Sequence, residues 1–245
     1  MNLCQLKELT LKHAQELSYI NIDKNGCYEG WVTDFRLKHK SSGEKIGLNL
    51  KKEDDLFLFF VLASSWSRTG YWENALFFIA YLKTTYNINK VISGEIKITP
   101  NDVAFNQDNF EGIETRKKVS FRKDFYDSVD VLLKNWDDIK KVLHLSEKLE
   151  NWKIFIEYIS HLKGLGANEK AMKIKIPFIL RELRCQKIYS NIDGEYCCVA
   201  DERVRKAYKS LKKKLPTNYL EASNKIYKDF GDLYDIPAFA YFDLI

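Results

Sequence analysis

Apolar residues recur at helical spacing over most of the chain, and strand-like alternation is rare. A first amphipathic helix is predicted by residues that recur at three- and four-residue steps, namely Leu3, Leu6, Leu9 or Thr10, His13 and Leu17. We expect this helix to end before Asn25 and Gly26, and residues 22–50 to be irregular.

The segment from Asp54 to Trp66, DDLFLFFVLASSW, is nearly all apolar after an acidic first turn. This pattern is typical of a helix that is buried on most sides. Taken alone, LFLFFVL could equally form a buried strand. The helical pattern of residues 71–83, which follows Gly70, favours a pair of helices.

Residues 86–118 are the least helical region, with Gly94, Pro100 and Gly112, and are predicted to form a short strand or a long loop. Three further helical patterns follow, over 121–136, 137–149 and 151–162. We therefore predict an all-α or nearly all-α fold.

The length of 245 residues and the 45% hydrophobic content allow one domain or two closely packed lobes. We expect 1–50 and 207–245 to form one helical lobe and 51–206 the other, with a cleft between them. Neither a membrane span nor a signal peptide is predicted, so we expect an intracellular, cytoplasmic protein, associated with the nucleoid if the source is prokaryotic. The five cysteines are expected to be reduced thiols, with no metal site and no cofactor.

The net charge of +5 is a mild excess, but basic residues are concentrated in a few segments. The strongest is RVRKAYKSLKKK, from Arg203 to Lys214. A local positive surface is what binding to a phosphate backbone requires, although each such segment alone is typical of a solvated helix face.

Residues 159–183, ISHLKGLGANEKAMKIKIPFILREL, predict a helix end, a tight turn and a second amphipathic helix, kinked at Pro177. Gly164 and Gly166 permit backbone conformations closed to other residues and leave amide groups uncovered. The amides of Gly164, Leu165 and Gly166 could bind one DNA phosphate, with Lys163 adding charge. A structural hairpin with glycine as a helix C-cap has the same pattern.

Asp201 follows the apolar stretch CCVA and precedes the basic segment. It is an ordinary helix N-cap residue in the simplest interpretation. The same position also holds a carboxylate rigid and ionised, as stabilisation of a sugar cation would require.

These motifs together resemble the helix-hairpin-helix DNA glycosylase superfamily, and within it the archaeal 8-oxoguanine glycosylases called AGOG. The likeness covers about 155–206 and rests on Ser160-His161-Leu162-Lys163-Gly164, Glu169-Lys170 and Val199-Ala200-Asp201-Glu202-Arg203-Val204. It implies a fold of two helical lobes and the excision of an oxidised purine, 8-oxoguanine first, from double-stranded DNA by a monomer.

By this resemblance Lys170 is the amine that attacks the sugar and forms a Schiff base, and Asp201 is the catalytic carboxylate. Asn168 stands where the endonuclease III branch places its lysine, so the spacing is similar to AGOG and not to that branch. Neighbouring lysines, among them Lys173 and Lys175, could compete for the same role.

Other contacts with DNA are assigned less directly. Arg205 is a candidate for phosphate binding, and Trp66, Phe239 and Asp243 are candidates for the pocket of the damaged base. Aromatic residues in such positions are more often buried in the core. Two other functions fit the sequence: a catalytically silent helix-hairpin-helix DNA-binding module, and a helical protein-interaction domain.

Overall fold

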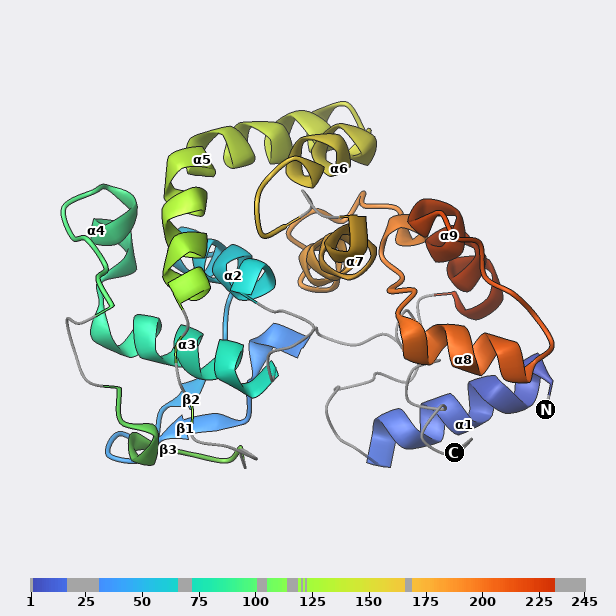
Figure 1. Ribbon diagram of the computed structural model, residues 1–245, viewed down its shortest axis with the longest axis horizontal. Coiled ribbons are helices and arrows are strands. Elements are labelled where there is room, and N and C mark those ends of the chain that lie inside the picture. The colour runs from blue at the N-terminus through green and yellow to red at the C-terminus, as the bar shows by residue number, and fades with distance from the viewer. Residues whose placement is uncertain are drawn as a thin grey trace. The chain divides into compact units, whose positions relative to one another are not determined.

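The computed structural model describes residues 2–16, 31–65, 72–100, 105–113, 119, 121, 123–165 and 169–231. This part of the chain is mainly helical (Figure 1), as the hydrophobic pattern predicts. The chain divides into two compact units: unit 1 comprises Met1–Trp31 and Val142–Ile245, and unit 2 comprises Val32–Lys141. No helix in the described ranges is both long enough and apolar enough to cross a membrane.

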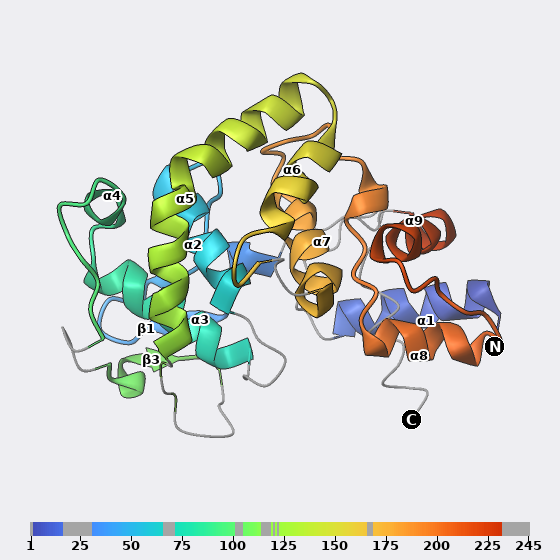
Figure 2. The same ribbon diagram turned by 45° about the horizontal axis from the view of Figure 1, so that its top comes forward.

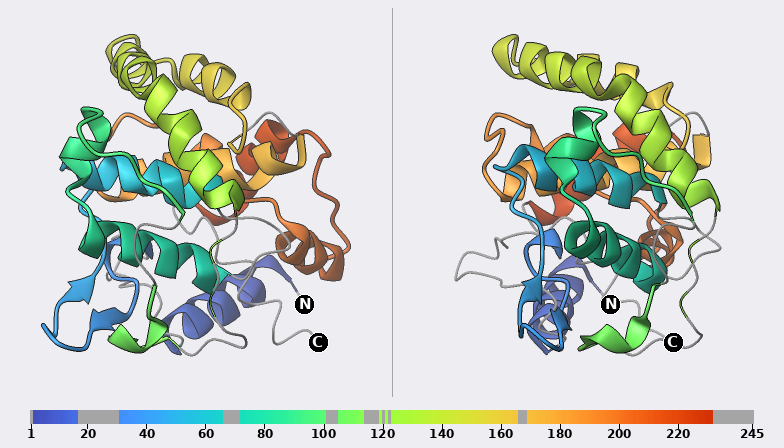
Figure 3. Two further views of the ribbon diagram at one scale, coloured as in Figure 1. Left: turned by 60° about the vertical axis from the view of Figure 1, so that its left-hand side comes forward. Right: turned by 90° about the vertical axis from the view of Figure 1, so that its left-hand side faces the viewer.

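Unit 2 contains a small antiparallel sheet. Two of its strands lie in residues 22–50, which were expected to be irregular, and the third lies in 86–118, where a short strand was one of the two alternatives. The strand order is β2-β1-β3, and the register pairs Leu37 with Ile46 and Lys38 with Glu111. Figure 3 shows these short strands beside α3, where the rings of Phe77 and Phe110 meet edge to face at 6.0 Å. The bounds are β1 Leu37–His39, β2 Lys45–Ile46 and β3 Phe110–Glu111, with the short 3-10 turns η1 Trp31–Thr33 and η2 Gln107–Asn109.

The apolar segment after Asp54 forms helix α2, Glu53–Ser65, so the strand alternative is wrong. It packs on α3, Trp72–Thr85, and on the short α4, Ile88–Ile92. Every residue from Phe57 to Ser65 is buried, because α2 has neighbours on all sides and no solvent-facing stripe.

Helix α5, Lys123–Lys148, replaces the two separate helices expected over 121–149. The predicted break after Trp136 is wrong. The Trp136 ring packs edge to face against Phe57, with centroids 5.1 Å apart, and its Nε1 donates to Glu53. Lys140 bonds the same Glu53 carboxylate at 2.6 Å and lowers the pKa of that group. These contacts hold the middle of α5 against α2 without interrupting the helix.

Unit 1 is built from the remaining helices. Its helices α6 and α7 pack together, η3 packs on α9 and α7, and α7 contacts α9. Pro177 is buried inside α7, which continues through it. The bounds are α1 Leu3–Glu16, α6 Trp152–Ser160, α7 Glu169–Cys185, η3 Gly194–Tyr196, α8 Glu202–Ser210 and α9 Tyr219–Phe230.

The two units differ from the lobes expected at 1–50 with 207–245 and at 51–206. Residues 32–50 lie in unit 2, because the amide of Asn49 donates to Asp55 and Lys83 donates to the carbonyl of Gly47. Residues 142–206 lie with the termini, because the amide of Cys198 donates to Ser223 on α9. Tertiary hydrogen bonds, which no local pattern encodes, set these boundaries.

We predict that the ion pair between Lys83 and Asp55 is essential to the stability of unit 2. The Lys83 Nζ lies 2.5 Å from Asp55 Oδ1, and the Asp55 side chain is only 5% exposed. Lys83→Met should lower the free energy of unfolding by about 3 kcal/mol, because it leaves a buried carboxylate without its cation. Urea unfolding measures this loss.

The matched control is Lys45→Met, which removes an exposed partner of Asp34 at 3.7 Å. It should change the free energy of unfolding by less than about 0.5 kcal/mol. Equal effects of the two substitutions would contradict the assignment.

Candidate functional site

The predicted hairpin is present as two helices joined by a tight turn. Figure 2 shows α6 and α7 side by side in unit 1. After α6 ends at Ser160, the amide of Leu165 donates to the carbonyl of Leu162, and Gly164 has a φ of 88°. Positive φ at the third position of a four-residue turn is typical of type II turns and favours glycine. Gly164 of the LKGLG motif is therefore required by the turn. The Leu165 amide, which was expected to bind a DNA phosphate, is instead engaged by the carbonyl of Leu162 within the turn.

Side chains on both sides fix this turn. Leu165 is fully buried, and the Lys175 ammonium donates to the carbonyl of Gly164 at 2.5 Å. Lys163 is exposed on the same turn. A rigid turn that carries an exposed cation satisfies two requirements of a phosphate site, since little conformational entropy is lost on binding.

The structure narrows the choice of nucleophilic lysine. Lys170 is the second residue of α7, as the spacing predicts. The side chains of Lys170 and Lys173 lie outside the described residues, and so does the whole of Gly166. Lys175 is buried and bonded to the hairpin carbonyl, so its ammonium serves the turn. A buried, hydrogen-bonded ammonium is a poor candidate for attack on a substrate.

Asp201 is the N-cap of α8, as predicted. Its backbone is extended, with φ −69° and ψ −179°, and its Oδ1 accepts from the amide of Val204 at 2.9 Å. The side chain is half-buried. The carboxylate is thus held in a fixed direction at the positive end of the α8 dipole.

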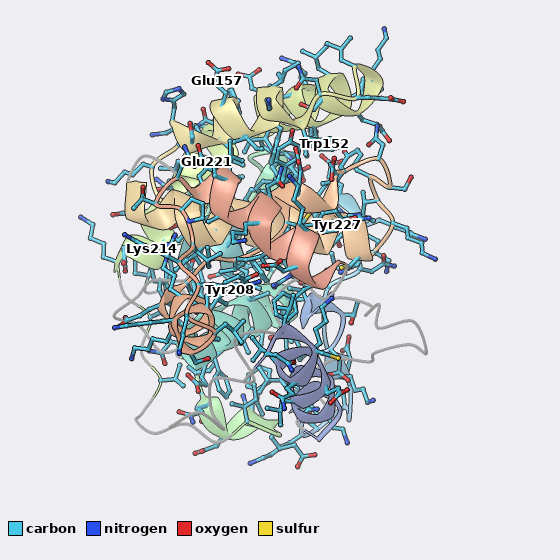
Figure 4. All side chains as sticks on the ribbon, turned by 90° about the vertical axis from the view of Figure 1, so that its right-hand side faces the viewer. Trp152, Glu157, Tyr208, Lys214, Glu221 and Tyr227 are labelled. Atoms are coloured by element: carbon cyan, nitrogen blue, oxygen red, sulfur yellow. The ribbon has the colours of Figure 1, made fainter. Side chains whose placement is uncertain are left out.

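The segment that leads to Asp201 has little regular structure and is anchored to its neighbours. Gly194 packs so closely that an added Cβ would come within 2.3 Å of the Tyr227 ring and 2.5 Å of the Arg184 guanidinium. Two side chains of α9 bind the same segment: Asn224 donates to Glu195 at 2.5 Å, and Ser223 accepts from the amide of Cys198 at 2.9 Å. Figure 4 shows Tyr227 on α9 and Tyr208 on α8.

The two thiols within this segment are poor nucleophiles. Cys197 and Cys198 are buried, and burial raises the pKa of the Cys197 thiol well above its ordinary value. A thiol that stays protonated neither attacks a substrate nor binds a metal ion readily. Within the described ranges, no group of histidine, cysteine and acidic residues is arranged to hold a metal ion.

Arg205 has a structural role that its sequence position did not reveal. Its Nε donates to the carbonyl of Ala200 at 3.1 Å, and its Nη1 donates to the carbonyl of Pro216 at 2.8 Å. These bonds tie the residues before and after α8 together. Its assignment to a DNA phosphate stays a prediction, and the bonds to backbone carbonyls leave less of the guanidinium for that purpose.

The predicted lesion-pocket residues Trp66, Phe239 and Asp243 lie outside the described residues. The exposed lysines in the last turn of α8 and just after it, by contrast, are described, and they received no individual assignment from the sequence. They are Lys209, Lys212, Lys213 and Lys214. The cluster of basic residues was visible in the sequence, but which of them face solvent was not.

Comparison with known proteins gives no family for this chain. No protein-family model, no curated protein and no solved structure matches it.

We predict that Asp201 stabilises α8 through its oxygen and not through its charge. Asp201→Ala should lower the free energy of unfolding by about 1 kcal/mol, because the amide of Val204 loses its acceptor. Asp201→Asn should leave it nearly unchanged, since asparagine caps helices about as well as aspartate. Thermal or urea unfolding of the two variants measures the difference, and equal losses would show that the charge itself is structural.

Proposed function

We propose that the protein is a DNA glycosylase with an associated lyase activity, which removes an oxidised purine, 8-oxoguanine first, from duplex DNA. Lys170 is the nucleophile and Asp201 the carboxylate that stabilises the sugar cation. The helix-hairpin-helix glycosylase fold, with a cleft between two lobes, is part of this proposal.

The observation that carries the proposal is that two features lie in the same unit. One is the carboxylate of Asp201, which caps α8. The other is the hairpin with its glycine turn, whose second helix, α7, has Lys170 in its first turn. The turn with Gly164 at positive φ suits binding of a phosphate, and the α8 N-terminus suits a fixed negative charge. Glycosyl transfer to an amine requires a lysine, a carboxylate and a site that binds a backbone phosphate.

The chemistry follows from these groups. The target nucleotide leaves the base stack, and the neutral Lys170 amine attacks C1′. The bond between C1′ and the base breaks, and the base leaves as it takes up a proton. The new bond from Nζ to C1′ becomes an imine when the sugar ring opens and O4′ is protonated. Loss of a proton from C2′ then expels the 3′ phosphate by β-elimination.

Two groups prepare this reaction. Lys170 must be partly neutral, which nearby cations such as Lys173 promote by disfavouring a second positive charge. Asp201 faces the cationic sugar with a charge that is already in place, so little reorganisation is needed in the transition state. Its cap bond to Val204 fixes the direction of that charge.

A silent DNA-binding module is the alternative that the hairpin itself favours. The turn and Lys163 explain phosphate binding without any chemistry, and a fold does not imply an activity. Such a module retards duplex DNA in a gel and cuts no lesion. A protein-interaction domain, the third possibility, ignores DNA altogether.

We predict that borohydride traps a covalent complex between the wild-type chain and a duplex that contains 8-oxoguanine. Hydride reduces an imine to a stable amine, so only an amine nucleophile gives this product. Lys170→Gln should abolish trapping and leave duplex affinity nearly unchanged, because the turn and its exposed Lys163 remain. Denaturing electrophoresis of the labelled duplex measures the covalent product.

The matched control is Lys173→Gln, one helical turn further along α7, which should still trap. If Lys170→Gln traps and Lys173→Gln does not, the residue assignment is wrong and the reaction class stands. If the wild-type chain neither traps nor releases any base from a panel of damaged duplexes, the glycosylase proposal is wrong.

We predict that Asp201→Asn slows base release by at least about 100-fold in single-turnover assays. The substitution removes the charge opposite the sugar cation and keeps the helix cap, so the loss should appear without a loss of stability. An unchanged rate would reduce Asp201 to a structural cap.

A further inference from the structure

Exposed lysines gather in unit 1 where α8 ends. Four lysines are exposed within six residues: Lys209, Lys212, Lys213 and Lys214. We call them the α8 lysine patch. Figure 4 shows Lys214 beyond the end of α8, at the margin of the unit. None of the four forms an ion pair with another described residue, whereas Lys206, on the same helix, lies 3.7 Å from Glu202.

The backbone beneath the patch is held in place. The amide of Lys213 donates to the carbonyl of Tyr208, and that of Lys212 donates to Lys209. Lys212 has a φ of 55°, the left-handed conformation that commonly ends a helix. Arg205 bonds the carbonyls of Leu215 and Pro216 at 3.4 and 2.8 Å, which closes the turn from the other side.

These contacts divide the basic segment into two parts with different roles. Arg205 donates to backbone carbonyls and Lys206 lies beside an acidic side chain, so both already have partners within the unit. The lysines of the patch are exposed and have no acidic partner among the described residues. Four like charges within six residues repel one another, and a polyanion relieves that repulsion when its counterions are released.

The surface favours duplex DNA over a membrane. A helix that binds a lipid surface inserts an exposed apolar face, but Val204, Ala207 and Tyr208 of α8 are all buried. Lysine also suits backbone phosphates, because its ammonium is a point charge with no fixed geometry for reading bases.

We infer that the α8 lysine patch is a second DNA-binding surface, distinct from the hairpin, that contacts backbone phosphates to one side of the target nucleotide. The location rests on the proposed function, because it is measured from Asp201. Nine residues of α8 separate Asp201 from the turn, which is about 13 Å of helix. At about 3.4 Å of axis per nucleotide, the contacted phosphates lie within roughly four steps of the target.

The first experiment uses undamaged duplex and needs no catalysis. Lys212→Gln, Lys213→Gln and Lys214→Gln, combined in one protein, should weaken binding on the order of a hundredfold near 0.1 M salt. The slope of log affinity against log salt should fall by about 2 to 3, for three lost phosphate contacts. Fluorescence anisotropy over a salt series measures both.

The matched control removes the same charge elsewhere in unit 1. Lys148→Gln, Lys153→Gln and Lys228→Gln together replace three other exposed lysines. This variant should keep the wild-type salt slope. Equal losses of duplex affinity in the two triple variants would show a general effect of net charge and overturn the inference. Binding to vesicles that contain anionic lipid, with no binding to duplex, would overturn it as well.

The second experiment tests the location. Neutral methylphosphonates within four steps of an 8-oxoguanine should weaken binding by the wild-type chain and have little effect on the patch variant. Equal weakening of both proteins would overturn the assigned position. A chain that binds undamaged duplex through the patch but never releases a base would refute the proposed glycosylase and leave the patch as a DNA-binding surface.

Discussion

The position of Asp201 depends on the close packing of Gly194 between α7 and α9. A Cβ added at Gly194 would come within 2.3 Å of the Tyr227 ring and 2.5 Å of the Arg184 guanidinium, so any other residue there would force these two side chains to move while η3 packs on both helices. The hydrogen bonds of Ser223 and Asn224 then hold the segment that leads into α8. Without this anchoring, the cap at Asp201 would begin a helix whose direction was not fixed, and a carboxylate without a fixed direction stabilises no particular charge.

Arg205 extends the same constraint to the other end of α8. Its guanidinium joins Ala200, before the helix, to Leu215 and Pro216 after it. The result is a short helix with a fixed carboxylate at its N-terminus and exposed lysines beyond its C-terminus. This polarity matches the helix dipole at both ends, since anions are favoured at the N-terminus and cations at the C-terminus. One nine-residue helix thus positions the proposed catalytic charge and the proposed DNA-binding surface.

The hairpin shows the opposite balance between local and distant interactions. Gly164 adopts positive φ because the type II turn demands it, and this could be predicted from the LKGLG sequence. The bond from Lys175 to the Gly164 carbonyl could not, because the sequence gives four lysines between Ile159 and Leu183 and no indication of which one turns inward. That bond removes Lys175 from the candidate nucleophiles and leaves the resemblance to the AGOG glycosylases as the ground for choosing Lys170.

Periodicity and capping chemistry by themselves determined the helical class, the buried α2, the hairpin and the Asp201 cap, because each depends on residues within a few positions of one another. Tertiary structure alone decided the rest. The sheet pairs Lys38 with Glu111, α5 runs unbroken because Trp136 finds Phe57 and Glu53, and Arg205 turns inward to distant carbonyls. These contacts join residues far apart in sequence, so no local pattern carries their energy.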